Sequence, residues 1–92
     1  AGLETLTRYM AIELAPRGIN VNAISPGYVN TDALHHFPNE DQMIRDAKAS
    51  TPNKRVLTGE DIGKVVLFLA SNDASMIRGQ VIVVDGGMSL VK

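Results

Sequence analysis

The sequence predicts an α/β fold in which a helix precedes one β-α-β unit. Two segments have the length of strands: residues 19–24, with apolar side chains at Ile19, Val21, Ala23 and Ile24, and residues 80–84, a nearly unbroken β-branched run. Between them lie apolar residues at helical spacing, bounded by polar loops. Because two strands joined through a helix need a crossover connection, we expect them to run parallel with a right-handed connection. The 92 residues suffice for one small domain at most, so we treat 1–92 as a single unit.

The first helix is predicted from an apolar stripe near the amino terminus. Pro16 and Gly18 end this helix, as such residues commonly do. A stripe of this kind packs on the core of its own domain or forms a subunit interface, and the sequence does not separate the two. The stripe consists of Leu3, Leu6, Met10 and Leu14, with Ala11 and Ala15 beside it.

The first strand leads into a polar loop. We expect the strand to break at residues 25–27 (Ser-Pro-Gly), where proline lacks an N–H donor and glycine permits unusual dihedral angles. A hydroxyl and a carboxylate, Thr31 and Asp32, follow in the loop. In open α/β sheets, ligands bind outside the carboxyl ends of the strands. The loop is therefore a candidate binding site, and a simple strand-to-helix turn is the alternative.

Two further helices are predicted along the chain. Asn39 is a candidate N-cap, and the acidic residues that follow it suit the positive end of a helix dipole. Farther on, Thr58 and Asp61 have the spacing of a short capping box. The apolar face of the earlier helix is Met43, Ile44 and Ala47; that of the later one is Ile62, Val65, Val66 and Leu69, widened by Phe68.

Several polar or small residues have structural interpretations that we favour over ligand binding. Asn20 and Asn22 alternate with apolar residues in the first strand, and we expect them to bond to neighbouring backbone. The adjacent pair His35-His36 does not share one helix face, so we expect two exposed histidines and no metal site. Gly86-Gly87 is too short for a phosphate cradle and is interpreted as a turn. The run 80–84 before it is interpreted as a strand buried on both faces.

Composition excludes several classes of function. Nine basic and ten acidic residues give a net charge of -1, which argues against a nucleic-acid binder. There is no cysteine, hence no disulfide framework and no thiolate metal site, and this composition suits a reducing cytosol. The longest apolar run, Val65–Ala70, is too short to span a membrane, and no segment of these 92 residues has the charged start, apolar middle and small-residue cleavage site of a signal peptide.

The chain carries no catalytic constellation of its own. No glycine-rich dinucleotide loop, Walker-type loop, nucleophile elbow or zinc-binding helix motif occurs. The chain also begins inside a predicted helix that has no cap before it. We therefore expect a fragment of a longer protein, in which the first helix and one side of the first strand lie bare.

Two segments resemble the short-chain dehydrogenase/reductase family. Residues 22–31 match its pattern Asn-x-x-x-Pro-Gly-x-x-x-Thr, and residues 77–87 match its last strand with the flanking Arg-Gly and Asp-Gly-Gly. Residues 31–39, the Thr51-Pro52 pair and residues 76–80 further resemble FabL-type enoyl-[acyl-carrier-protein] reductases. Sister enzymes such as 3-oxoacyl-carrier-protein reductases share the loop and tail patterns. One departure is Gly59, where many relatives place proline to open the helix.

The resemblance implies a Rossmann-like doubly wound parallel sheet, of which this chain is the carboxyl-terminal part. The family's catalytic tyrosine and lysine would precede Ala1, so no catalytic residue is assigned within the chain. The implied cofactor is NADPH, bound at the lip of the nicotinamide pocket. Its expected contacts are the Pro26 and Gly27 turn, the Val29 backbone and the Thr31 hydroxyl, although Thr31 could instead cap the segment that follows it.

The resemblance also implies a substrate and a cellular setting. Residues 33–50 would cover the acyl chain of an acyl-carrier-protein thioester, with contacts from Ala33, Leu34, Phe37 and Met43. The parent would be a cytoplasmic homo-oligomer, a homotetramer, acting in fatty acid biosynthesis. Two alternatives stay open: a 3-oxoacyl reductase or other short-chain dehydrogenase, and a non-catalytic truncation or cleavage product.

Overall fold

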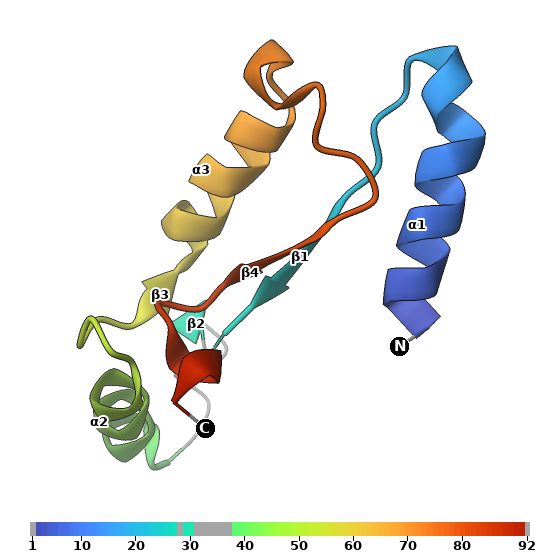
Figure 1. Ribbon diagram of the computed structural model, residues 1–92. Coiled ribbons are helices and arrows are strands. Elements are labelled where there is room, and N and C mark those ends of the chain that lie inside the picture. The colour runs from blue at the N-terminus through green and yellow to red at the C-terminus, as the bar shows by residue number, and fades with distance from the viewer. Residues whose placement is uncertain (1, 28, 31–37, 92) are drawn as a thin grey trace. The chain divides into compact units, whose positions relative to one another are not determined.

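The computed structural model describes residues 2–27, 29–30 and 38–91. They fall into two compact units, one within Ala1–Ser25 and Lys64–Val83, the other within Pro26–Gly63 and Val84–Lys92. Figure 1 shows the elements in chain order. The helices are α1 (Gly2–Leu14), α2 (Glu40–Ser50) and α3 (Gly59–Leu69), and the strands are β1 (Ala23–Pro26), β2 (Val29–Asn30), β3 (Leu57–Thr58) and β4 (Val81–Val84). None of the described helices is long and apolar enough to cross a membrane.

In the first unit, α1 packs through small residues, and its leucine stripe is largely exposed. Thr7 and Ala11 are buried, whereas Leu3 and Leu6 are 64% and 53% exposed. Small side chains face inward because the turn at Gly79 comes very close: a Cβ added there would lie 3.2 Å from the Ala11 Cβ. The predicted helix and its bare apolar face are confirmed. Within the described residues, Leu14 and Ala15 of the stripe are half-buried, and the choice between core packing and a subunit interface stays open.

The strands β1 and β4 pair in parallel. The Ala23 N–H donates to the Gln80 carbonyl and the Gly27 N–H to the Val84 carbonyl, so both strands advance by four residues in the same direction. Pro26 lies at a position between residues whose N–H groups face β4. Its lack of an N–H therefore removes no hydrogen bond between the strands. The parallel prediction is confirmed, and so is the end of the strand near Gly27.

The predicted start of the first strand, at residue 19, is wrong. The strand begins only at Ala23, although the Gly79 N–H already donates to the Val21 carbonyl at 2.8 Å. Between these two points the Asn22 side chain, and not a backbone group, bonds to the opposite segment. Asn22 Oδ1 accepts the Gln80 N–H at 3.0 Å, and Nδ2 donates to the Ile77 carbonyl at 2.8 Å. The expectation that this asparagine bonds to neighbouring backbone is confirmed.

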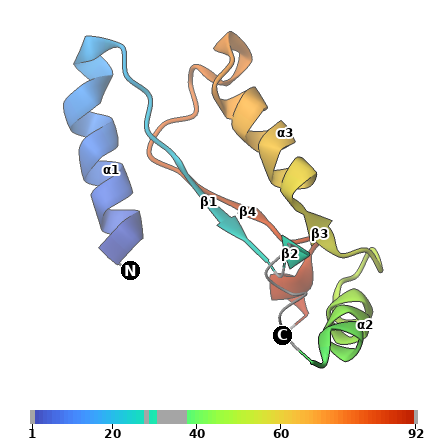
Figure 2. The ribbon, with the colours of Figure 1, turned by 180° about the vertical axis from the view of Figure 1, so that it is seen from behind.

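Two helices flank this strand pair. In both views α1 lies on one side of β1 and β4 and the end of α3 on the other (Figures 1 and 2). The predicted burial of β4 on both faces is wrong, because the described elements leave Val83 55% exposed. On α3, Val65 and Leu69 are half-buried as predicted, but Val66 and Phe68 are 50% and 49% exposed.

The second unit contains α2 and a strand pairing that the sequence does not predict. Asn39 occupies the N-cap position of α2 without a side-chain cap bond. Ala47 is buried and Met43 half-buried, which confirms the predicted apolar face. The two-residue strands β2 and β3 pair in parallel, Val29 opposite Leu57.

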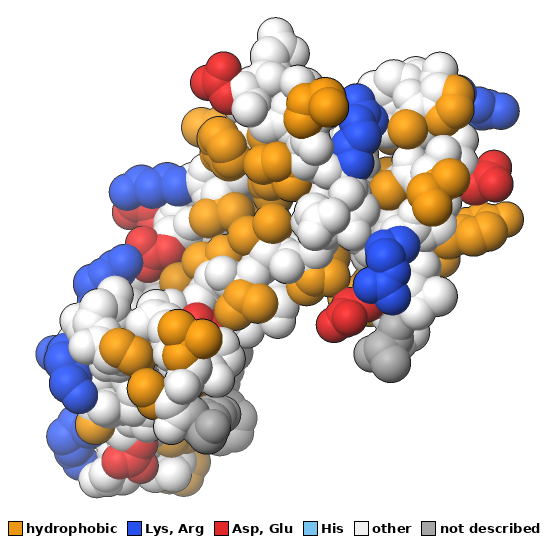
Figure 3. Space-filling view, in the orientation of Figure 1, with side chains coloured by type: hydrophobic (Ala, Val, Ile, Leu, Met, Phe, Trp, Pro, Cys, Tyr) orange, Lys and Arg blue, Asp and Glu red, His pale blue; other side chains and the backbone are white. Residues whose placement is uncertain are grey.

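The core is thin. The buried apolar residues among those described are Ala11, Ala47 and Ala74, and no large side chain among them is fully buried. Hydrophobic side chains instead lie on the surface, as Figure 3 shows for the face that carries α1. Little apolar area is therefore removed from water within these residues.

Candidate functional site

The carboxyl end of β1 carries the first two candidate residues. Pro26 is exposed and ends the strand, and Gly27 is half-buried beyond it. A Cβ added at Gly27 would lie 2.8 Å from the Asp85 Cβ and 3.2 Å from its Cα. Glycine fits here because real Cβ atoms essentially never approach another atom as closely as the 2.8 Å to the Asp85 Cβ. The structure therefore gives a steric reason for glycine at position 27.

The structure describes only two of the other predicted site residues. Val29 lies in β2, and Met43 lies half-buried on α2. The remaining four fall outside the described residues: Thr31, Ala33, Leu34 and Phe37. The structure thus brings Pro26, Gly27, Val29 and Met43 into one unit.

Sequence reasoning missed the surroundings of the Asp85–Gly87 turn. Gly86 and Gly87 have positive φ angles of 65° and 90°, which confirms the predicted turn. Hydrogen bonds from the Ser89 side chain and backbone, and from the Gly87 N–H, lower the pKa of the Asp85 carboxyl. Asp85 Oδ1 accepts from Gly87 and Oδ2 from Ser89, both at 2.9 Å. The Asp-Gly-Gly sequence predicts a turn but does not say which distant residues it meets.

The predicted capping box at the start of α3 is confirmed. Asp61 Oδ2 accepts the Thr58 N–H at 2.9 Å, and the Asp61 N–H donates to Thr58 Oγ1 at 3.3 Å. Arg55 adds a bidentate contact to the same carboxylate, at 2.8 and 3.0 Å. The Arg55 guanidinium first, and then the Thr58 backbone and hydroxyl, hold the pKa of Asp61 well below its ordinary value. This cluster fixes the loop before α3 to the helix end.

A cavity of about 200 Å³ lies between the Arg55–Asp61 ion pair and the Asp85–Gly87 turn. It is lined by Asn53, Arg55, Leu57, Asp61, Val84, Asp85 and Gly86. The carboxylates of Asp61 and Asp85 are already occupied by donors. Among the described residues, no group of three His, Cys, Asp or Glu could hold a metal ion.

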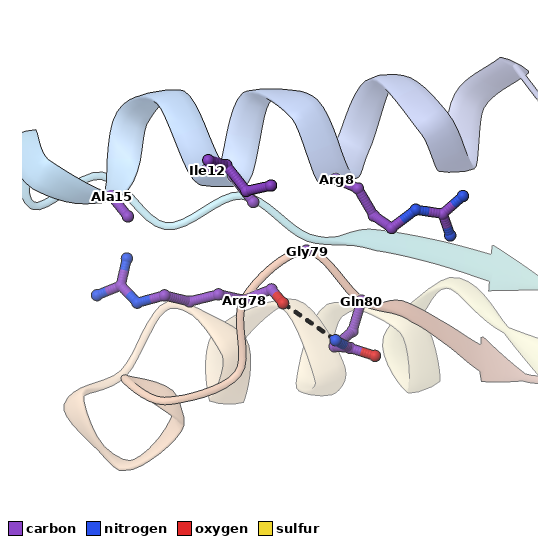
Figure 4. A pocket seen from close by; sticks show the side chains of 7 residues that line it. Arg8, Ile12, Ala15, Arg78, Gly79 and Gln80 are labelled. Carbon is purple, nitrogen blue, oxygen red and sulfur yellow. Dashed lines mark hydrogen bonds between the residues drawn. The ribbon is translucent and has the colours of Figure 1, made fainter.

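A second cavity, of about 320 Å³, lies in the first unit between α1 and residues 78–80 (Figure 4). The side chains of Arg8 and Arg78 extend away from each other at its ends. Arg78 Nη1 donates to the Ile19 carbonyl at 3.2 Å, and Gln80 Nε2 donates to the Arg78 carbonyl at 3.1 Å. The two arginines therefore do not converge on a shared anion.

Comparison with known proteins identifies the family. A family model described as enoyl-(acyl carrier protein) reductase matches residues 1–89. The chain belongs to this family. A solved short chain dehydrogenase family protein from Francisella tularensis superposes with a TM-score of 0.84 at 26% identity, covering 97% of this chain and 40% of its own. The Rossmann-like α/β fold is thereby confirmed, and the family is that of the short-chain dehydrogenases/reductases.

Individual relatives differ in activity. The NADH-dependent enoyl-[acyl-carrier-protein] reductase FabI of Escherichia coli is 41% identical over 98% of this chain and 34% of its own length. The 3-oxoacyl-[acyl-carrier-protein] reductase FabG of Buchnera aphidicola is 42% identical over 95% of the chain and 35% of its own. The structure of YwfH, an NADPH dependent reductase involved in bacilysin biosynthesis, has a TM-score of 0.82 at 35% identity, covering 95% of this chain and 36% of its own. The chain spans about a third of the length of these relatives.

Proposed function

We propose that the chain is the carboxyl-terminal part of a FabL-type enoyl-[acyl-carrier-protein] reductase that reduces trans-2-enoyl thioesters with NADPH in fatty acid biosynthesis. The observation that carries the proposal is the match of the enoyl-(acyl carrier protein) reductase family over residues 1–89. Two relatives, FabI and FabG, act by name on acyl-carrier-protein thioesters. The intact protein is a cytoplasmic homo-oligomer in this proposal.

Residues at the carboxyl end of β1 would bind the nicotinamide. A carboxamide presents one acceptor and two N–H donors, which a backbone N–H and C=O or a hydroxyl can satisfy. In this proposal the backbone of Val29 and the hydroxyl of Thr31 supply such groups, together with the turn at Pro26 and Gly27. When bound, the cofactor supplies the hydride that adds to the β-carbon of the enoyl thioester. The chain's own residues would orient the nicotinamide ring through its carboxamide.

The segment that follows would contact the acyl chain. Met43 presents a flexible apolar side chain on the half-buried face of α2, and such a side chain adapts to an alkyl chain. In the proposal Ala33, Leu34 and Phe37 also contact the acyl chain. The tyrosine and lysine that stabilise the enolate would belong to the part of the protein that precedes Ala1.

A second candidate function is 3-oxoacyl-[acyl-carrier-protein] reduction. It is favoured by the 42% identity to FabG. A third candidate, a non-catalytic truncation product, is favoured by the thin core of the described residues, whose buried apolar members are three alanines.

A substrate comparison separates these functions. The full-length protein is assayed with crotonyl and acetoacetyl thioesters of acyl carrier protein, each with NADPH and with NADH. The proposal predicts rapid oxidation of NADPH with the crotonyl thioester and slow oxidation with the acetoacetyl thioester. The reverse preference would replace it by the 3-oxoacyl function, and faster turnover with NADH would remove the NADPH assignment alone.

A further inference from the structure

The Asp85–Gly87 turn touches two segments that the proposed function assigns to different ligands. On one side it meets Gly27 at the cofactor end of β1. The Gly27 N–H donates to the Val84 carbonyl at 3.1 Å, and a Cβ at Gly27 would lie 2.8 Å from the Asp85 Cβ. The position of Gly27 is therefore set by the strand end and the turn that follows it.

On the other side the turn meets the residues that follow α2. A Cβ added at Gly86 would lie 2.5 Å from Thr51 Cγ2, and one added at Gly87 would lie 3.1 Å from Pro52 Cγ. Thr51 is 3% exposed, and its hydroxyl donates to the Ala47 carbonyl at 2.8 Å. The carboxyl end of α2 thus rests directly on the two glycines.

The turn itself is held internally. Both carboxylate oxygens of Asp85 accept backbone N–H groups, from Gly87 and Ser89, at 2.9 Å. Positive φ angles at Gly86 and Gly87 allow the tight path. A turn braced in this way can serve as a fixed surface for both neighbours.

We propose that the Asp85–Gly87 turn is a positioning element that sets the place of Gly27 for the cofactor and of α2 for the acyl chain. This inference rests on the proposed function for the identity of the two ligands. Both ends of the chain between Gly27 and Thr51 then depend on one three-residue turn. Glycine at position 86 is required because any side chain there displaces Thr51 and, with it, α2.

The test is Gly86→Ala in the full-length protein, with Gly18→Ala as its matched control. Gly18 also has a positive φ, 77°, but a Cβ there meets nothing within 4 Å, so the backbone strain is similar and the contact is absent. We expect Gly86→Ala to lower kcat/KM by about tenfold to a hundredfold, since small misplacements have effects of this size. The loss should appear as a higher KM for both NADPH and crotonyl thioester, while Gly18→Ala keeps both values.

A second substitution tests the named contact. Thr51→Ser removes Cγ2 and keeps the hydroxyl that bonds to the Ala47 carbonyl. We expect the double variant Gly86→Ala/Thr51→Ser to recover part of the lost kcat/KM, because the contact with Thr51 is relieved while the added Cβ still lies 2.9 Å from Asn53 Oδ1. Absence of recovery, or equal behaviour of Gly86→Ala and Gly18→Ala, would overturn the inference.

Two further measurements test the positioning role of the turn even if Gly86→Ala does not fold or the substrate assignment is wrong. If Gly86→Ala does not fold, Gly87→Ala introduces the milder contact with Pro52 and should raise the same two KM values by a smaller factor. If the wild type reduces no enoyl thioester, the proposed function fails, but hydrogen exchange of the α2 amides still applies. Faster exchange in α2 for Gly86→Ala than for Gly18→Ala supports the positioning role, and equal exchange overturns it.

Discussion

At the scale of single residues, Asp61 links the loop before α3 to the helix. Its carboxylate accepts from Arg55 and from Thr58, and these donors lower its pKa in the folded protein. The unfolded chain has the ordinary value of about 3.9 and so binds more protons in acid. The stabilisation is therefore complete above roughly pH 5 and is lost as the pH falls through 4 and below. We predict that Asp61→Asn lowers the melting temperature at pH 7 and flattens its decline between pH 5 and pH 3. A parallel decline in both proteins would contradict the linkage.

Thr31 is the residue on which the cofactor assignment depends most. Thr31→Val keeps the shape and removes the hydroxyl. If the hydroxyl bonds to the cofactor, NADPH affinity falls by about 1 kcal/mol, the usual scale of one neutral hydrogen bond, while the stability of the free protein hardly changes. If Thr31 only caps a turn, stability falls by a similar amount and affinity stays. Melting temperatures with and without NADPH separate the two, and an unchanged cofactor-induced shift would end the binding assignment.

At the scale of elements, Asn22 controls where β1 and β4 begin to pair. Its side chain bonds to the Gln80 N–H and the Ile77 carbonyl, so Asn22→Ala leaves two backbone groups without their partner. We predict a loss of about 1 to 3 kcal/mol in the unfolding free energy of the full-length protein. Asn20→Ala is the comparison variant and should cost less, because Asn20 Nδ2 donates to the Ala74 carbonyl and Oδ1 accepts from Asn22 Nδ2, both at a long 3.4 Å. Equal losses in denaturant unfolding would argue against the assigned role.

The elements also show what a sequence can predict. Helices α1, α2 and α3 follow from apolar periodicity and from the Thr58–Asp61 cap, since these signals are local. The start of β1 does not, because an asparagine side chain replaces backbone there. The pairing of β2 with β3 involves two residues on each strand and joins segments that are distant in the sequence. No local sequence pattern predicts such a pairing.

The candidate site follows the same division. Pro26 and Gly27 are found from the sequence because a strand end has a local signature. The close approach of Gly86 to Thr51 cannot be predicted from residue spacing, because the two residues are 35 positions apart and meet only in the folded chain. The sequence predicts that Gly86 and Gly87 form a turn, but it does not predict which distant residues the turn contacts.

At the scale of the whole molecule, the thin core predicts poor autonomy. The described residues bury three alanines and leave Leu3, Ile12 and Val83 more than half exposed. Burial on this scale does not offset the conformational entropy of ordering the chain. We predict that the isolated 92-residue chain unfolds without cooperativity or aggregates, as measured by thermal melting with light scattering. A monodisperse monomer with a sharp transition would show this to be wrong.

We propose that this chain belongs to an enzyme that transfers hydride to the β-carbon of an enoyl thioester. The most direct measurement uses the full-length protein, crotonyl thioester and NADPH that carries deuterium at the transferable position of its nicotinamide ring. We expect a butyryl product with one deuterium on the β-carbon and none on the α-carbon, as detected by NMR. A crotonyl thioester recovered unchanged, under conditions in which acetoacetyl thioester yields a 3-hydroxybutyryl product with deuterium on its β-carbon, would contradict it.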